Sequence, residues 1–247
     1  MRDSWRLAIG TLTALPIQPP LQVDARTARF AVLLAPLAAA PLGLAVGAVL
    51  WLAGHFGLAP MAAGLLSIGV LALGSRAFHV DGLADTSDGL TASYDRERSL
   101  AVMKSGSVGP AGALAIVVVL GLQAVGFSAF VGNPIAAVLL VCLSRAVLAL
   151  TCMAGVPAAA GDGLRTPFAG CVPAPLAATY WIGIAALSAV ALAGLDLPWR
   201  HVLAGFGIAT VLVALLLRRA TNRLGGVTGD IFGASIEITL AALLISV

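Results

Sequence analysis

The sequence predicts an all-α, polytopic membrane protein of about seven transmembrane helices, within a range of six to eight. The 247-residue chain is 60% hydrophobic and only 10% charged, whereas soluble domains average about 25% charged residues. Apolar runs of about 20 residues, the length that crosses a bilayer core, recur along the whole chain. These runs are too continuously apolar for the alternating strands of a membrane β-barrel.

Seven apolar runs define the expected spans. They cover residues 30–52, 59–77, 108–131, 134–155, 176–195, 201–219 and 231–247. Gly and Ala are frequent in all of them, which predicts close helix packing. Pro36 and Pro41 should kink the first span, and an amphipathic or re-entrant element should precede it. We expect residues 1–247 to form a single domain.

Basic residues fall almost entirely in alternate loops. Those before the first span and after the second, fourth and sixth spans are Arg2, Arg6, Arg26, Arg29, Arg76, Arg96, Arg98, Lys104, Arg165, Arg218, Arg219 and Arg223. The other three loops carry only Arg200. The positive-inside rule therefore predicts a cytoplasmic N-terminus, with loops 78–107, 156–175 and 220–230 on the cytoplasmic side.

Residues 79–90, HVDGLADTSDGL, gather a third of the aspartates of this apolar chain. Asp81, Asp85 and Asp88 stand at i, i+4 and i+7, which places them on one face of a helix. Three like charges at a low-dielectric edge repel one another, and a divalent cation would remove that conflict. Oxygen ligands favour Mg²⁺, with Mn²⁺ as the alternative. A helix N-terminus that merely attracts acids would explain one or two of the three.

A second group of candidates begins the last span, in NRLGGVTGDIFGASIE, 222–237. Asp230 starts the expected helix, and Glu237 lies two turns deeper on the same face; we take both as further metal ligands. The glycine-rich turn could present N–H groups to a phosphate. The substrate-binding candidates of this turn are Asn222, Gly226 and Thr228. The alternative for Glu237 is a buried structural ion pair with Arg145.

Basic and polar side chains complete the candidate site. Lys104 and Ser105 belong to MKSGSVGPAG, which is similar to an anion-binding turn, the alternative being a snorkelling lysine and a polar cap. His79 could be a ligand, a proton carrier or a phosphate donor. The arginines that could bind phosphate, or serve only as cytoplasmic anchors, are Arg76, Arg96, Arg98 and Arg165.

Carboxylates that hold Mg²⁺ beside basic residues suit phosphoryl or nucleotidyl transfer from a diphosphate. One carboxylate that the metal does not saturate could accept the proton of the attacking hydroxyl. Asp88 is the expected base and Asp230 the alternative. Asp85 and His79 complete the catalytic candidates.

Three motifs resemble those of the cobalamin synthase family: FHVDGLADTSDGL, VMKSGSVGPAG and LGGVTGDIFGASIEIT. The resemblance spans nearly the full length. It implies a Mg²⁺-dependent adenosylcobinamide-GDP ribazoletransferase of the bacterial cytoplasmic (inner) membrane, with its active site facing the cytoplasm. Its substrates would be adenosylcobinamide-GDP and alpha-ribazole or alpha-ribazole 5'-phosphate. Its products would be adenosylcobalamin, or the 5'-phosphate, and GMP.

The resemblance carries the family's acid motif over to Asp81, Asp85 and Asp88, and its C-terminal motif to Asp230 and Glu237. The chain also departs from the family pattern. Many members read MKDSRxG where this chain has MKSGSVG, so the Asp and Arg of that motif cannot be essential here.

Two other functions remain open from the sequence. A CDP-alcohol phosphotransferase spreads its acids over a longer motif that contains an Arg, which is absent here. A transporter would place ionisable groups near the membrane midplane, and only Glu237 and Arg145 fit that pattern. The expected partners are the two substrates and the lipid bilayer, with no nucleic acid. A homo-oligomer and association with other cobalamin-assembly enzymes stay open.

Overall fold

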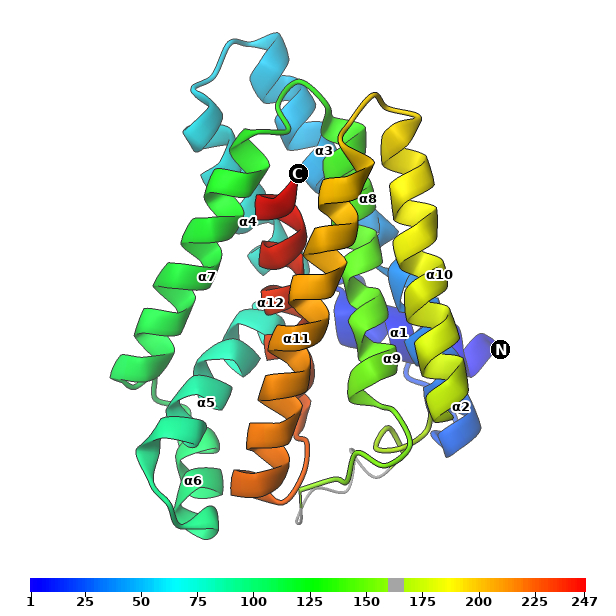
Figure 1. The fold of residues 1–247 in the computed structure, drawn as a ribbon. Helices are drawn as coiled ribbons and strands as arrows, with labels where there is room; N and C mark the ends of the chain where they lie inside the picture. Colours follow the sequence, from blue (N-terminus) through cyan, green and yellow to red (C-terminus); the bar gives the residue numbers. More distant parts are fainter. Residues whose placement is uncertain (160–166) are drawn as a thin grey trace.

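The computed structural model describes residues 1–159 and 167–247; its regular secondary structure in those ranges is helical, with no β-strand (Figure 1). Its elements are α1 (Arg2–Leu12), α2 (Ala25–Ala38), α3 (Ala40–His55), α4 (Pro60–Gly74), α5 (Phe78–Ala92), α6 (Arg96–Met103), α7 (Pro110–Ser128), α8 (Pro134–Ser144), the 3₁₀ turn η1 (Arg145–Val147), α9 (Leu148–Thr151), α10 (Ala174–Ala193), α11 (Trp199–Leu224) and α12 (Gly229–Ser246). The all-α prediction is confirmed.

The described helices also confirm a polytopic membrane protein. Six stretches are long and apolar enough to cross a bilayer: Ala25–His55, Pro110–Ser128, Pro134–Thr151, Ala174–Ala193, Trp199–Leu224 and Gly229–Ser246. A seventh crossing results when α4 and α5 are taken together. The expected proline break in the first span is present, because α2 ends at Ala38 with Pro36 inside it and α3 begins at Ala40.

A sharp corner separates α4 from the helix that carries the acid motif. The axes of α4 and α5 differ by 92°. Arg76 and Ala77 form the corner in the left-handed region, each with φ of 56°, a conformation that costs a non-glycine residue roughly 1–2 kcal/mol. The hydroxyl of Ser75 donates to the carbonyl of Leu71 at 2.8 Å, the same oxygen that accepts the N–H of Ser75 at 3.0 Å. Because of this bend, α5 does not continue the axis of α4, and its aspartates lie beyond the corner.

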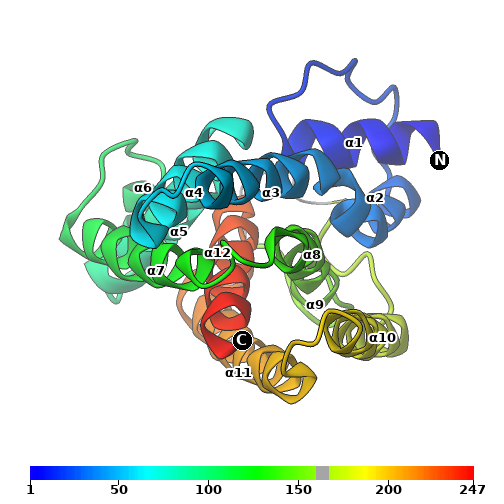
Figure 2. The same cartoon turned by 90° about the horizontal axis from the view of Figure 1, so that it is seen from above.

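Helix α12 lies at the centre of the bundle, and α5, α7, α8 and α11 pack around it (Figure 2). Small residues permit this packing, as predicted: a Cβ added at Gly126 on α7 would lie 2.5 Å from the Cβ of Leu244 on α12. The α6 helix and the α11–α12 turn lie at one end of the bundle (Figure 1). The α3–α4, α7–α8 and α10–α11 connections lie at the other end. Which end faces the cytoplasm stays a prediction.

Candidate functional site

The acid motif forms α5, so the three aspartates do share one helix, but they occupy three different environments. Asp81 is exposed, Asp85 is partly buried and Asp88 is buried. The spacing predicted one open face with all three aspartates; instead, one aspartate faces solvent and another lies in the core.

Asp88 is bound by the backbone of the following helix. Its Oδ2 accepts a hydrogen bond from the N–H of Gly109 at 2.7 Å, and its Oδ1 accepts one from the N–H of Gly112 at 2.8 Å. Gly109 is the N-cap of α7, where backbone N–H groups lack partners within the helix and the dipole favours an anion. The anion-binding turn predicted in MKSGSVGPAG thus binds an anion of its own chain. With both oxygens engaged, Asp88 fastens α5 to α7, and the geometry does not favour it as the free base.

The other acids meet where α5 crosses α12. A Cβ added at Gly82 would lie 2.7 Å from the backbone oxygen of Asp230, so the two helices touch between Asp81 and Asp85. Partial burial, together with the charges of Asp81, Asp230 and Asp88, raises the pKa of Asp85 to about 6. The carboxylates of both motifs are therefore brought into one electrostatic neighbourhood, as the sequence predicted. We call Asp81, Asp85 and Asp230 the open acid group.

Within residues 1–159 and 167–247, no three His, Cys, Asp or Glu side chains form a ready-made metal site. Mg²⁺ does not require one, since it is usually held by one or two carboxylates and completes its shell with water and substrate phosphate oxygens. The all-oxygen donors of the open acid group suit such an ion. Magnesium binding stays a prediction.

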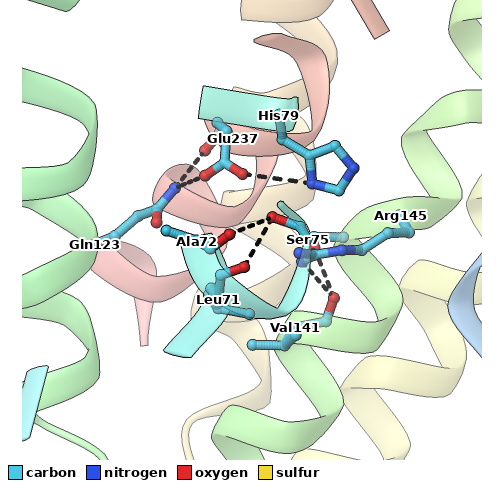
Figure 3. Close-up of polar contacts among 9 residues, drawn as sticks. Leu71, Ala72, Ser75, His79, Gln123, Val141, Arg145 and Glu237 are labelled. Atoms are coloured by element: carbon cyan, nitrogen blue, oxygen red, sulfur yellow. Dashed lines mark hydrogen bonds and ion pairs between the residues drawn. The ribbon is translucent and has the colours of Figure 1, made fainter. Parts of the chain in front are cut away.

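Glu237, also predicted as a metal ligand, lies in a separate group inside the bundle (Figure 3). Its side chain is buried, and Gln123 Nε2 donates to its Oε2 at 2.6 Å and to its backbone oxygen at 3.1 Å. His79 Nδ1 lies 3.7 Å from Oε1 on the other side. His79 is buried too, so the structure places both residues away from the exposed carboxylate of Asp81.

The alternative prediction, an ion pair between Glu237 and Arg145, is also not observed in the described part of the chain. Arg145 is buried in η1, and its Nη1 donates to the carbonyl of Val141 at 2.7 Å and to the hydroxyl of Ser144 at 2.8 Å. Sequence analysis missed Gln123 as the partner of Glu237. Its signal was available, because Gln123 is a polar residue in the middle of a predicted span.

The glycine-rich turn before α12 is largely occupied by protein contacts. Gly226 packs so tightly on Ala158 that an added Cβ would overlap its backbone. Thr228 caps α12: its Oγ1 accepts from the N–H of Ile231 at 3.4 Å and donates to Oδ2 of Asp230 at 3.1 Å. Of the two, Thr228 bears on the site directly, because it orients a carboxylate of the open acid group.

Arg76 has a structural role at the α4–α5 corner. Its Nη2 donates to the carbonyl of Gly10 in α1 at 2.7 Å, and its guanidinium lies 4.6 Å from the centre of the Phe78 ring. These contacts join α1 to the corner and account for the guanidinium without a phosphate.

The remaining substrate-binding candidates are exposed or lie outside the described residues. Lys104 and Ser105 are exposed, and the hydroxyl of Ser105 donates to the carbonyl of Val102 at 2.8 Å. Asn222 is exposed near the end of α11. Arg165 falls within 160–166, outside the described residues.

Arg96 lies against the glycine-rich turn that precedes Asp230. Its exposed guanidinium lies directly over Gly225, where an added Cβ would overlap it. Gly225 ends α11 with φ of 76°, a left-handed position that glycine adopts without strain. Sequence analysis named Arg96 and Arg98 as equal candidates, and both are exposed on the short helix α6.

Comparison with known proteins decides the family. The sequence profile described as cobalamin-5-phosphate synthase matches residues 4–247. The chain belongs to the cobalamin-5-phosphate synthase family. This result confirms the family that the three motifs indicated, and it covers both helices that carry the acids.

Three relatives of this member of the cobalamin-5-phosphate synthase family carry the name adenosylcobinamide-GDP ribazoletransferase. The relative from Nocardioides sp. is 52% identical over 246 residues, which cover 100% of this chain and 98% of the relative. Those from Frankia casuarinae and Escherichia coli are 34% and 35% identical; the matches cover 97% and 80% of this chain, and 92% and 80% of the relatives. No solved structure matches the chain.

Proposed function

We propose that this protein is an adenosylcobinamide-GDP ribazoletransferase. It joins adenosylcobinamide-GDP to alpha-ribazole, or to alpha-ribazole 5'-phosphate, and releases GMP. The observation that carries the proposal is the 52% identity, along the whole chain, to a relative of that name. The open acid group supports it, because a diphosphate substrate calls for carboxylates beside basic residues at an accessible surface.

Binding of the diphosphate would use groups of both signs at the end of the bundle that carries α6. Asp81 and Asp230 are the carboxylates that would hold Mg²⁺, and the ion would neutralise charge on the departing phosphate. Arg96 lies over the turn that leads into Asp230 and can donate to phosphate oxygens. Thr228 fixes the orientation of the Asp230 carboxylate through its 3.1 Å hydrogen bond.

The transfer needs an acceptor for one proton. The hydroxyl oxygen of the ribazole attacks the phosphorus on the cobinamide side, and the bond from that phosphorus to the bridging oxygen breaks. The electron pair of the broken bond leaves with GMP. Asp85 accepts the hydroxyl proton, because it lies on the same helix as Asp81 and beside Asp230, whereas both oxygens of Asp88 are occupied by backbone donors.

The proposed location is the bacterial cytoplasmic membrane, with the open acid group on the cytoplasmic side. The support is the distribution of basic residues over alternate loops, together with the placement of α6 and the α11–α12 turn at one end of the bundle. A cysteine introduced at Ser105 should react with a membrane-impermeant thiol reagent only after the cells are opened.

The reaction is tested with the purified protein in detergent. Adenosylcobinamide-GDP, alpha-ribazole and Mg²⁺ should give GMP and adenosylcobalamin in equal amounts, and a chelator should stop both. The matched control is Asp196→Asn, an exposed acid in the α10–α11 connection at the opposite end, which should retain full activity. Absence of GMP release with intact protein and excess Mg²⁺ would refute the proposed function.

A further inference from the structure

A group of charged and polar side chains lies inside the bundle, separate from the open acid group. We call His79, Gln123, Arg145 and Glu237 the buried charge cluster. They come from α5, α7, η1 and α12, and all are at most 5% exposed. Figure 3 shows Gln123 and His79 on either side of the Glu237 carboxylate. The cluster therefore joins the acid helix to three other elements.

The charges of Arg145 and Glu237 compensate each other within this cluster, although the two side chains form no direct ion pair. The positive charge of Arg145 acts on both Glu237 and His79. Gln123 supplies the short hydrogen bond to the carboxylate. Arg145 Nε and His79 Nδ1 have no hydrogen-bond partner in the described part of the chain. Charges enclosed in a low-dielectric interior are tolerated when they compensate one another, and removing one member leaves the other uncompensated.

The cluster also determines which face α5 presents. His79 and Asp81 are two residues apart, so they lie on nearly opposite sides of the helix. A Cβ added at Gly233 of α12 would lie 3.0 Å from the Cα of His79, so α12 grips α5 at the same level. With His79 facing inward beside Glu237, Asp81 must face outward. A rotation of α5 that moved His79 away from Glu237 would carry Asp81 away from the open face.

We propose that His79, Glu237 and Arg145 are positioning residues, which hold α5 so that the open acid group binds a divalent cation. This inference rests on the proposed function for its metal, but it assigns Glu237 to the support of the site and not to the ligands. Mutation of residues that orient metal ligands without binding the metal typically changes the metal affinity about 10–100-fold.

The experiment measures Mn²⁺ binding to the full chain in detergent by electron paramagnetic resonance, without substrate. Glu237→Gln and Arg145→Met should each raise the Kd for Mn²⁺ about tenfold. The double variant, which removes both charges together, should return to within about threefold of the wild type, because no uncompensated charge remains. Glu97→Gln, the same substitution at an exposed site on α6, should leave the Kd unchanged.

Two results would overturn the inference. Unchanged Mn²⁺ affinity in Glu237→Gln would show that the cluster does not position the ligands. Lost affinity that the double variant fails to restore would make Glu237 a ligand. If Glu237→Gln does not fold, His79→Gln decides, with the same tenfold expectation. Wild-type protein that binds Mn²⁺ but releases no GMP would refute the proposed reaction and leave the positioning role standing.

Discussion

The open acid group lies on α5 and α12, which also carry His79 and Glu237 of the buried charge cluster, yet the electrostatics of the two groups are opposite. Around Asp85, partial burial and, after it, the charges of Asp81, Asp230 and Asp88 raise the pKa to about 6. Around Glu237, one amide bonds the carboxylate while a histidine and a buried arginine lie near it. Like charges gather in the open acid group, whereas groups of opposite sign compensate one another in the buried charge cluster. An acid residue in a membrane protein is therefore interpreted from its neighbours rather than from its depth alone.

The largest expected effect comes from Asp85→Asn, which tests the open acid group directly. Loss of the proposed base should lower kcat for GMP release by about 10³-fold. The melting temperature should stay the same or rise, because repulsion with Asp81 and Asp230 is relieved. Both are measured on the same preparation, beside Asp196→Asn. Full activity in Asp85→Asn would show that the open acid group has no role in the reaction, and the contrast between the two groups would then have no functional meaning.

Asp88→Asn separates an acid that holds the fold from one that reacts. The amide would replace one carboxylate oxygen by a donor that faces the N–H of Gly109 or Gly112. Loss of a charge-assisted hydrogen bond should cost about 2 kcal/mol of stability, seen as earlier thermal unfolding than in Asp85→Asn. Unchanged stability with abolished turnover would return Asp88 to the role of general base.

Gly82→Ala tests whether contact between α5 and α12 assembles the open acid group. The new methyl group would lie 2.7 Å from the backbone oxygen of Asp230, and rigid backbone cannot yield as a side chain can. The helices must separate, so Mg²⁺-dependent activity should fall about tenfold. Gly121→Ala on α7 is the matched control, because nothing lies within 4 Å of its added Cβ. Equal activity in the two variants would show that this contact does not assemble the site.

The smallest effect is expected for Ser105→Ala. Its exposed hydroxyl is already bonded to the carbonyl of Val102 and lies 3.0 Å from that of Ser107. An exposed substitution of this kind is worth about 0.5 kcal/mol or less, so KM for adenosylcobinamide-GDP should change about twofold at most. A larger rise in KM would restore Ser105 as a substrate-binding residue.

Local patterns predicted the helices well, because hydrophobic length and the i, i+4, i+7 spacing act within single segments. The position of α12 beside the acid helix was also foreseeable in outline, since both motifs hold carboxylates. The anion held by the MKSGSVGPAG turn was not, because Asp88 and Gly109 are 21 residues apart and meet only through packing. For the same reason, the hydrogen bond from Gln123 to Glu237 was not foreseen, since the two residues are 114 positions apart. Arg145, the partner expected for Glu237, lies near it but makes no direct ion pair with it.

The corner between α4 and α5 has one more consequence. It contains no proline, and its two left-handed residues, Arg76 and Ala77, are not glycines. Local backbone bonds close the turn, among them the one from the N–H of Ala77 to the carbonyl of Ala72 at 2.6 Å. Contacts with other elements hold the angle as well, chiefly the bond from Arg76 to α1 and the packing of His79 against α12. The backbone of these two residues is therefore strained, and the surrounding fold keeps them in the left-handed conformation. A chain deprived of α1 would lose the angle before it lost any helix.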